Sequence, residues 1–157
     1  MGEIQIRRAS AADVDGFVAS SARLFAEDAG TYDDTVDVEW PRKHGAQRFL
    51  DGLGDPQRLV LVAVAPPGTV VGHLVGLVSE PTAMRPVRVA TLLSLYVFGA
   101  HRGGGVGARL VNEFRQWARG RDSDRLEVTA YAGNDGALRF YRRHGFAAQS
   151  VLLEALP

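Results

Sequence analysis

The sequence predicts a single α/β domain over residues 1–157, with strands and helices in the order β-α-α-β-β-β-α-β-α-β. Two patterns predict this class. Apolar runs of strand length alternate with amphipathic stretches of helix length, and a run of glycines joins an apolar strand to a helix at residues 99–107. The chain is also long enough, at 157 residues of which 46% are hydrophobic, to bury a substantial core.

The first half of the chain is expected to contain one strand, two helices and a hairpin. The stretch Glu3–Arg8 alternates apolar and polar residues, which indicates a strand, and Ser10 is a suitable N-cap for the helix that follows. A second helix is expected at Pro41–Leu53, because proline is tolerated at a first helical position. Two apolar stretches around a Pro-Pro-Gly turn then predict a hairpin of strands Arg58–Ala65 and Thr69–Ser79.

The second half continues the alternation around the glycine run. Its helices are recognised by apolar positions along one face or by a glycine that ends them, and its strands by continuous apolar runs. The expected elements are a strand at Val87–Phe98, a helix at Val106–Arg119, a strand at Leu126–Tyr131, a short helix at Asp135–His144 and a final strand at Phe146–Leu156.

Composition argues against several classes of function. The formal net charge is zero, whereas nucleic-acid binders usually carry a basic excess. There is no cysteine for disulfides or thiolate chemistry, and the histidines at positions 44, 73, 101 and 144 lack metal-ligand spacing, so we expect no metal site. No apolar run approaches a membrane span or forms a signal peptide. We therefore expect a cytoplasmic protein that binds neither nucleic acid nor a membrane.

The glycine run is a candidate phosphate-binding loop. Glycines let a ligand approach the backbone closely, and the first amides of a helix attract an anion. A P-loop is excluded because no lysine follows the glycines, and Lys43 is the only lysine in the chain. The pattern Gly103-x-Gly105-x-x-Ala108, with Glu127 further on, fits a dinucleotide fingerprint loosely. A nicotinamide-dinucleotide binder is therefore one alternative.

Two motifs fit another family better. The first is Arg102-x-x-Gly105-x-Gly107, and the second runs from Asn134 to Phe146 and contains Ala137, a Phe-Tyr pair and a final Gly-Phe. In this order and spacing they resemble the GNAT superfamily of N-acetyltransferases. The resemblance implies an α/β (α+β) GNAT fold, a mixed twisted sheet of about six to seven strands with helices on both faces. It also implies acetyl-CoA as cofactor.

The resemblance assigns the cofactor site residue by residue. The backbone of Leu95 and Val97 would bond the pantetheine arm, and Asn134 would contact that arm as well as cap its own helix. The sequence departs from the family at Gly99, where proline is usual. Backbone amides of one continuous stretch would hold the pyrophosphate: Arg102, Gly103, Gly104, Gly105, Val106, Gly107 and Ala108.

Catalysis would use a tyrosine. By resemblance, Tyr141 is the general acid that protonates the leaving CoA thiolate, and the Val97 amide stabilises the oxyanion. A tyrosine packed in the core is the alternative for Tyr141. The glutamate that many GNAT enzymes carry on the strand before the loop is missing at Thr91 and Leu93. The candidates for the general base are therefore carboxylates elsewhere in the chain: Glu27, Asp28, Glu80 and Glu127.

The acceptor is expected to be a primary amine on a small molecule or a peptide. Residues 27–39 hold six carboxylates and no lysine or arginine, which favours a cationic acceptor; a solvated acidic loop is the alternative. We therefore expect an N-acetyltransferase that uses direct transfer. A non-catalytic acyl-CoA-binding domain is the second hypothesis, and a homodimer is one assembly that the sequence allows.

Overall fold

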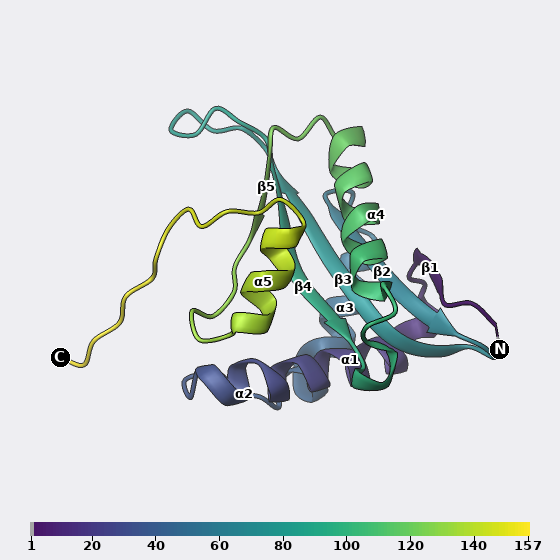
Figure 1. Cartoon of the computed structure of the whole chain (residues 1–157). Coiled ribbons are helices and arrows are strands. Elements are labelled where there is room, and N and C mark those ends of the chain that lie inside the picture. Colours follow the sequence, from purple (N-terminus) through teal and green to yellow (C-terminus); the bar gives the residue numbers. More distant parts are fainter. Residues whose placement is uncertain (1) are drawn as a thin grey trace.

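The computed structural model describes residues 2–157, which form a mixed five-stranded sheet in the order β1-β2-β3-β4-β5 (Figure 1). Neighbouring strands pair antiparallel from β1 to β4, whereas β4 and β5 are parallel. A parallel pair needs a crossover connection, and helix α4 supplies it. The strands are β1 (Gln5–Arg8), β2 (Arg58–Ala65), β3 (Thr69–Ser79), β4 (Val89–Val97) and β5 (Arg125–Val128).

Helices cover both faces of this sheet, as the sequence predicted. On one face lie the N-terminal helices, and on the other lie the two helices that follow β4 (Figure 1). The first group is η1 (Ala11–Asp13), α1 (Val14–Glu27), α2 (Ala29–Tyr32), the π-helical turn η2 (Pro41–Gly45) and α3 (Ala46–Leu53). The second group is α4 (Val106–Gly120) and α5 (Asp135–Arg143).

The larger core lies between the sheet and α4. Phe114, Leu110 and Val111 of α4 are almost fully buried against Leu74 of β3 and its neighbours. The position of α4 depends on Gly76 in β3, because a Cβ built there would lie 2.9 Å from the Phe114 ring. A side chain at this position would therefore force α4 away from the sheet.

The opposite face holds a smaller core built around two aromatic rings. Phe17 of α1 packs against Phe49 of α3, with ring centroids 4.6 Å apart, and Val60 and Val75 of the sheet complete the cluster. These contacts hold α1 and α3 against β2 and β3. The same four residues also line the pocket described below, which opens beside β4.

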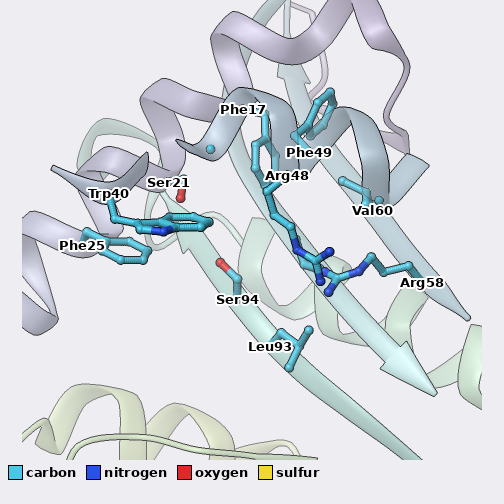
Figure 2. Close-up of a pocket in the computed structure, with 13 residues that line it drawn as sticks. Phe17, Ser21, Phe25, Trp40, Arg48, Phe49, Arg58, Val60, Leu93 and Ser94 are labelled. Atoms are coloured by element: carbon cyan, nitrogen blue, oxygen red, sulfur yellow. The ribbon is translucent and has the colours of Figure 1, made fainter. Parts of the chain in front are cut away.

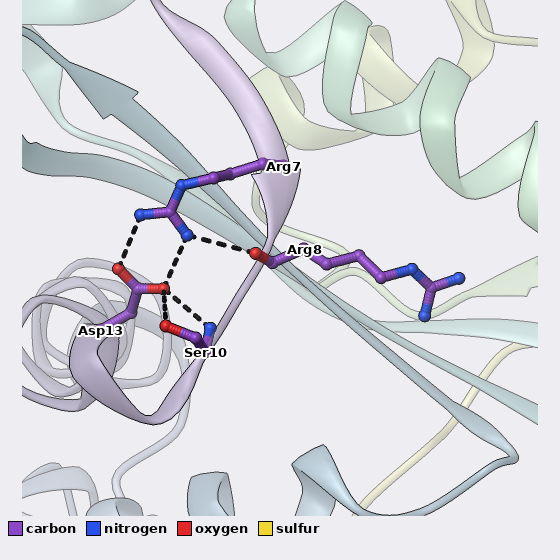
Figure 3. A network of polar contacts seen from close by, with 4 residues as sticks. All are labelled: Arg7, Arg8, Ser10 and Asp13. Carbon is purple, nitrogen blue, oxygen red and sulfur yellow. Dashed lines mark hydrogen bonds and ion pairs between the residues drawn. The ribbon is translucent and has the colours of Figure 1, made fainter.

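A polar network fixes the corner between β1 and α1 (Figure 3). Arg7 donates to both carboxylate oxygens of Asp13 at 2.8 and 2.9 Å, and the backbone N–H of Ser10 donates to Asp13 at 2.8 Å. These contacts, with that of Arg7 first, lower the pKa of Asp13 although burial opposes them. The sequence predicted Ser10 as the N-cap at this corner, but not the part that Arg7 plays.

Two expectations for the C-terminal part were wrong. The sheet has five strands rather than six or seven, and the final strand expected at Phe146–Leu156 does not form. The segment after Phe146 leaves the domain in an extended path (Figure 1), with Leu152 86% and Leu153 85% exposed. Apolar alternation can indicate a strand, but a strand also needs a neighbour to pair with, and this segment has none within residues 2–157.

The helices of the described chain are short. None of those within residues 2–157 combines the length and the apolar character that crossing a membrane would require.

Candidate active site

An exposed glycine loop connects β4 to α4. It starts with the short turn η3 (Gly99–His101), and Gly103 and Gly105 follow with φ angles of +82° and +84°. Such left-handed backbone favours glycine. A Cβ built on Gly103, Gly104 or Gly105 meets no atom within 4 Å, so the loop leaves room for a phosphate beside the first amides of α4. The loop therefore fits the pyrophosphate of a coenzyme.

The first residues of α4 serve the fold as well as the loop. Val106 is buried in the core, so only its backbone can reach a ligand. A Cβ on Gly107 would lie 3.2 Å from the ring of Phe140, so this glycine lets α5 pack against α4. Ala108 is half-buried.

The side chain of Arg102 has partners within the domain. Its Nε donates to the carbonyl oxygen of Val97 at 2.7 Å, and its Nη2 donates to Glu27 at 2.8 Å. The guanidinium lies 5.1 Å from the centre of the Tyr96 ring. Burial raises the pKa of Glu27, but Arg102, aided by Tyr96 and Arg23, lowers it by more. Arg102 thus joins the loop to the end of α1, a role that the sequence did not predict.

The backbone edge of β4 is open beside the loop. β4 pairs with β5 only from Val89 to Leu92, and Leu93 forms a bulge in the pairing with β3. The N–H of Phe98 donates to β3 at 2.8 Å, so by alternation the amides of Leu95 and Val97 point away from β3. They therefore face the side where β5 has already ended. An extended ligand arm with amide groups fits this edge.

Two predicted site residues belong to α5, which lies on the side of the open backbone edge of β4: Asn134 is its N-cap and Tyr141 lies within it. The side chain of Asn134 accepts from the N–H of Ala137 at 3.1 Å, which confirms the predicted N-cap, and donates to Asp28 at 3.1 Å. Burial, and after it the charge of Asp28, raises the pKa of Tyr141 to about 12. The Tyr141 ring packs near Phe140 and the main core, so the core role considered for it also applies.

The structure separates the four carboxylates considered as bases. Glu80 pairs with Arg88 and Glu127 pairs with Arg85, each at 2.7 Å, around the strand ends remote from the glycine loop. Glu27 pairs with Arg102. Asp28 alone among the four bonds to Asn134 and influences Tyr141. Burial raises the pKa of Asp28, while the hydrogen bond from Asn134 opposes part of that shift.

A pocket of about 260 Å³ opens on the α1 side of the sheet, beside the bulge of β4 (Figure 2). Phe25 and Trp40 form one wall, with their rings stacked 5.9 Å apart. Leu93 and Ser94 of β4 line the pocket next to the open backbone edge, so a molecule bound there would approach the edge from the face opposite α4.

Beneath this pocket lies a buried histidine that the sequence did not single out as a site residue. His73 is fully buried; its Nδ1 lies 2.6 Å from Ser20 Oγ and its Nε2 lies 2.6 Å from Ser94 Oγ. Burial lowers the pKa of His73 from 6.5 to about 3. The signal available in the sequence was a histidine within the apolar run of β3. The neutral imidazole fixes the hydroxyl of Ser94 at the pocket.

Comparisons with known proteins identify the family of the chain and support its fold. Residues 22–146 match the sequence model of the acetyltransferase (GNAT) family. A tetramutant of the BH1408 protein from Bacillus halodurans has a similar structure, with a TM-score of 0.88 at 22% identity over 98% of this chain and 99% of that one. No curated protein matches the chain.

Two further solved structures are similar and carry names of enzymes. One is an aminoglycoside acetyltransferase, meta-AAC0020, from an uncultured soil metagenomic sample in complex with sisomicin, with a TM-score of 0.69, 20% identity and coverage of 98% and 95%. The other is a ribosomal-protein-alanine N-acetyltransferase from Brucella melitensis, with a TM-score of 0.72, 19% identity and coverage of 98% and 99%. At these identities the structures support the fold alone. The family match, which covers both predicted motifs, shows that this chain belongs to the acetyltransferase (GNAT) family.

Proposed function

We propose that this protein transfers the acetyl group of acetyl-CoA directly to a primary amine. The observation that carries the proposal is the open backbone edge of β4, which leads straight into the exposed glycine loop at the start of α4. Pantetheine amides would bond to Leu95 and Val97, and the loop from Arg102 to Ala108 would hold the pyrophosphate. The side chain of Asn134 would lie beside the same arm. When bound, acetyl-CoA supplies an activated thioester.

The pKa shifts of two residues beside this edge support the proposed proton transfers. With a pKa of about 12, Tyr141 keeps its proton at neutral pH and can donate it to the departing sulfur. We assign the base to Asp28, because burial raises its pKa and so strengthens it as a proton acceptor. The new N–C bond forms as the C–S bond breaks; Asp28 takes the amine's proton and Tyr141 supplies the proton for the thiol. The Val97 amide is the proposed donor to the carbonyl oxygen.

Tyr141→Phe tests this proposal. The variant removes one hydroxyl and little volume, so CoA release in the presence of an amine should fall roughly 10- to 1000-fold while CoA affinity is nearly kept. Tyr32→Phe, at an exposed tyrosine of α2, is the matched control and should keep the wild-type rate. Unchanged turnover in Tyr141→Phe would leave this residue with its core role only. CoA binding without transfer to any amine would favour the non-catalytic alternative.

The primary amine that accepts the acetyl group is a candidate to be cationic, with a further positive group. A cationic acceptor is favoured by the acidic stretch 27–39 and by the similarity to an enzyme whose structure contains sisomicin. Much of that acidity is already engaged, since Glu27 pairs with Arg102 and Asp37 with Lys43, both at 2.8 Å. Asp34 and Glu39 are exposed. Polyamines and aminoglycosides therefore belong in the acceptor panel.

We also propose that two copies of the chain associate through residues 147–157. This segment presents Val151, Leu152, Leu153 and Leu156 with exposed fractions of 76–94%, and β5 is the last strand of the sheet with pairing on one side only. If the tail of each copy pairs with β5 of the other copy, the leucines are buried and the free edge of β5 is covered in both copies.

The mass in solution tests this assembly. Wild-type protein should sediment as a dimer, whereas a variant with Leu152→Ser and Leu153→Ser should sediment as a monomer. Met84→Ser is the control, because Met84 is 95% exposed on another loop and its loss should leave the dimer intact. A monomeric wild type at high concentration would contradict the proposal.

A further inference from the structure

The pocket beside β4 contains positive charge and no negative charge. Its lining includes Arg48 of α3 and Arg58 at the start of β2, and no aspartate or glutamate. Figure 2 shows the two guanidinium groups side by side within the pocket. The pKa of Arg58 is lowered, first by burial and then by the positive charge of Arg48.

Neither arginine has a full partner within residues 2–157. The nearest carboxylate to Arg58 is Asp55, whose Oδ2 lies 4.0 Å from Nε, and that Nε is buried without any hydrogen bond. Arg48 forms no ion pair with any described residue. Two neighbouring guanidinium groups repel each other, and a buried one without a partner is costly. An anion that accepts from both would remove both penalties.

The rest of the pocket sets the direction in which such a molecule would lie. The arginines come from α3 and β2, whereas Leu93 and Ser94 at the bulge of β4 border the open backbone edge. A volume of about 260 Å³ lies just below the roughly 300–1,000 Å³ of pockets that hold drug-sized ligands, so the bound group is small.

We infer that the acceptor is a small amine that also carries an anionic group, a carboxylate or a phosphate, which Arg48 and Arg58 bind while the amine points to the β4 edge. The inference rests on the proposed acetyl transfer and deepens it. It makes the arginines determinants of acceptor specificity, and it opposes a purely cationic acceptor.

Matched acceptor pairs test the inference through kcat/KM for CoA release. Amino acids are compared with their amides, and O-phosphoethanolamine is compared with ethanolamine, so each pair differs in the anionic group. Wild type should prefer the anionic member of at least one pair by roughly 10- to 100-fold, mostly through KM. The pair with the larger ratio of kcat/KM, anionic member over neutral member, shows whether the pocket prefers a carboxylate or a phosphate. A wild type that prefers the neutral members, or spermine and kanamycin, would overturn the inference while leaving acetyl transfer intact.

Variants of the pocket complete the test. The double variant Arg48→Gln and Arg58→Gln should lose the preference, chiefly through a higher KM for the anionic member of the pair. Arg42→Gln, at an exposed arginine outside the pocket lining, is the control and should keep the preference. If the double variant does not fold, Arg48→Gln alone should still reduce the preference, since Arg48 is exposed. A preference that survives these changes would refute the assignment.

A direct binding measurement separates this inference from the proposed reaction. If no amine supports CoA release, acetyl transfer fails, and inorganic phosphate is used as the probe of the pocket. Phosphate should then raise the melting temperature of the wild type and of Arg42→Gln equally, and by more than that of the double variant, in which only the glycine loop remains to bind it. The same shift in all three proteins would overturn the inference.

Discussion

His73 should make the stability of this protein depend on pH. Its imidazole is completely buried between Ser20 and Ser94, and burial lowers its pKa from 6.5 to about 3. In the unfolded chain the imidazole takes up a proton below 6.5, whereas in the folded protein it stays neutral down to about 3. The unfolded state therefore gains protons first, and the folded state loses stability as the pH falls between these two values.

The size of the effect follows from the two pKa values. Between about pH 7.5 and about pH 5, His73 should remove about 2 kcal/mol from the free energy of unfolding, since one pKa unit corresponds to about 1.4 kcal/mol. For a chain of this length that loss corresponds to a fall in melting temperature of about 4–8 °C. Urea unfolding followed by tryptophan fluorescence at both pH values measures the loss directly.

The variant His73→Gln isolates this contribution. Glutamine keeps a donor and an acceptor but does not titrate, so the variant should start less stable at neutral pH and lose about 2 kcal/mol less than wild type on acidification. Other titrating groups change both proteins alike and cancel in the comparison. His101→Gln, which removes an imidazole outside the core, is the control for the substitution itself. Parallel profiles for wild type and His73→Gln would refute the reasoning.

Three further predictions concern the loop, the base and the N-terminal corner. Gly105→Ala, at a φ of +84°, should destabilise the fold by about 1 kcal/mol and weaken CoA binding at least about tenfold, whereas Gly104→Ala adds a Cβ in open space and should affect CoA titrations only, by contact with the ligand. Asp28→Asn should lower kcat/KM roughly 10- to 1000-fold near neutral pH. In wild type, kcat/KM should fall on acidification with a midpoint above pH 3.8, and the variant should lack this fall; if the variant retains it, Asp28 is not the base. Asp13→Asn should cost roughly 1–3 kcal/mol at neutral pH by urea unfolding, and because the folded pKa of Asp13 is lowered, this cost should shrink as the pH falls below 3.8; a constant cost would contradict the role of the carboxylate.

The sequence predicted the fold best where local chemistry determines it. The bounds expected for β2 and β3 agree with the structure, because a Pro-Pro-Gly turn separates two continuous apolar runs. The segment after Phe146 has equally suitable apolar residues, yet it forms no strand. Pairing is a property of two segments, and no pattern within one segment shows whether a partner is present.

For the site, the sequence identified the loop and α5 but not the pocket. Glycine runs and helix caps are local signals, so residues such as Gly105 and Asn134 could be recognised by their neighbours in the chain. His73 meets Ser94 across paired strands, where the bulge at Leu93 sets the register, and Arg48 meets Arg58 only after α3 docks on the sheet. Such juxtapositions depend on packing, and the sequence carries no periodic pattern for them.

The glycine at position 76 would link the interior of the sheet to the affinity for the proposed acetyl donor. Helix α4 is rigid along its length. Phe114 lies over Gly76 and is eight residues from Val106, the first residue of α4, so the two positions are about 12 Å apart along the helix axis. If Phe114 is lifted, the whole helix tilts, and the amides at its first turn move relative to the edge of β4. Substitutions deep in this core would thus change how tightly the coenzyme is held without touching it, and donor affinity could be tuned from the protein's interior while the loop sequence stays the same.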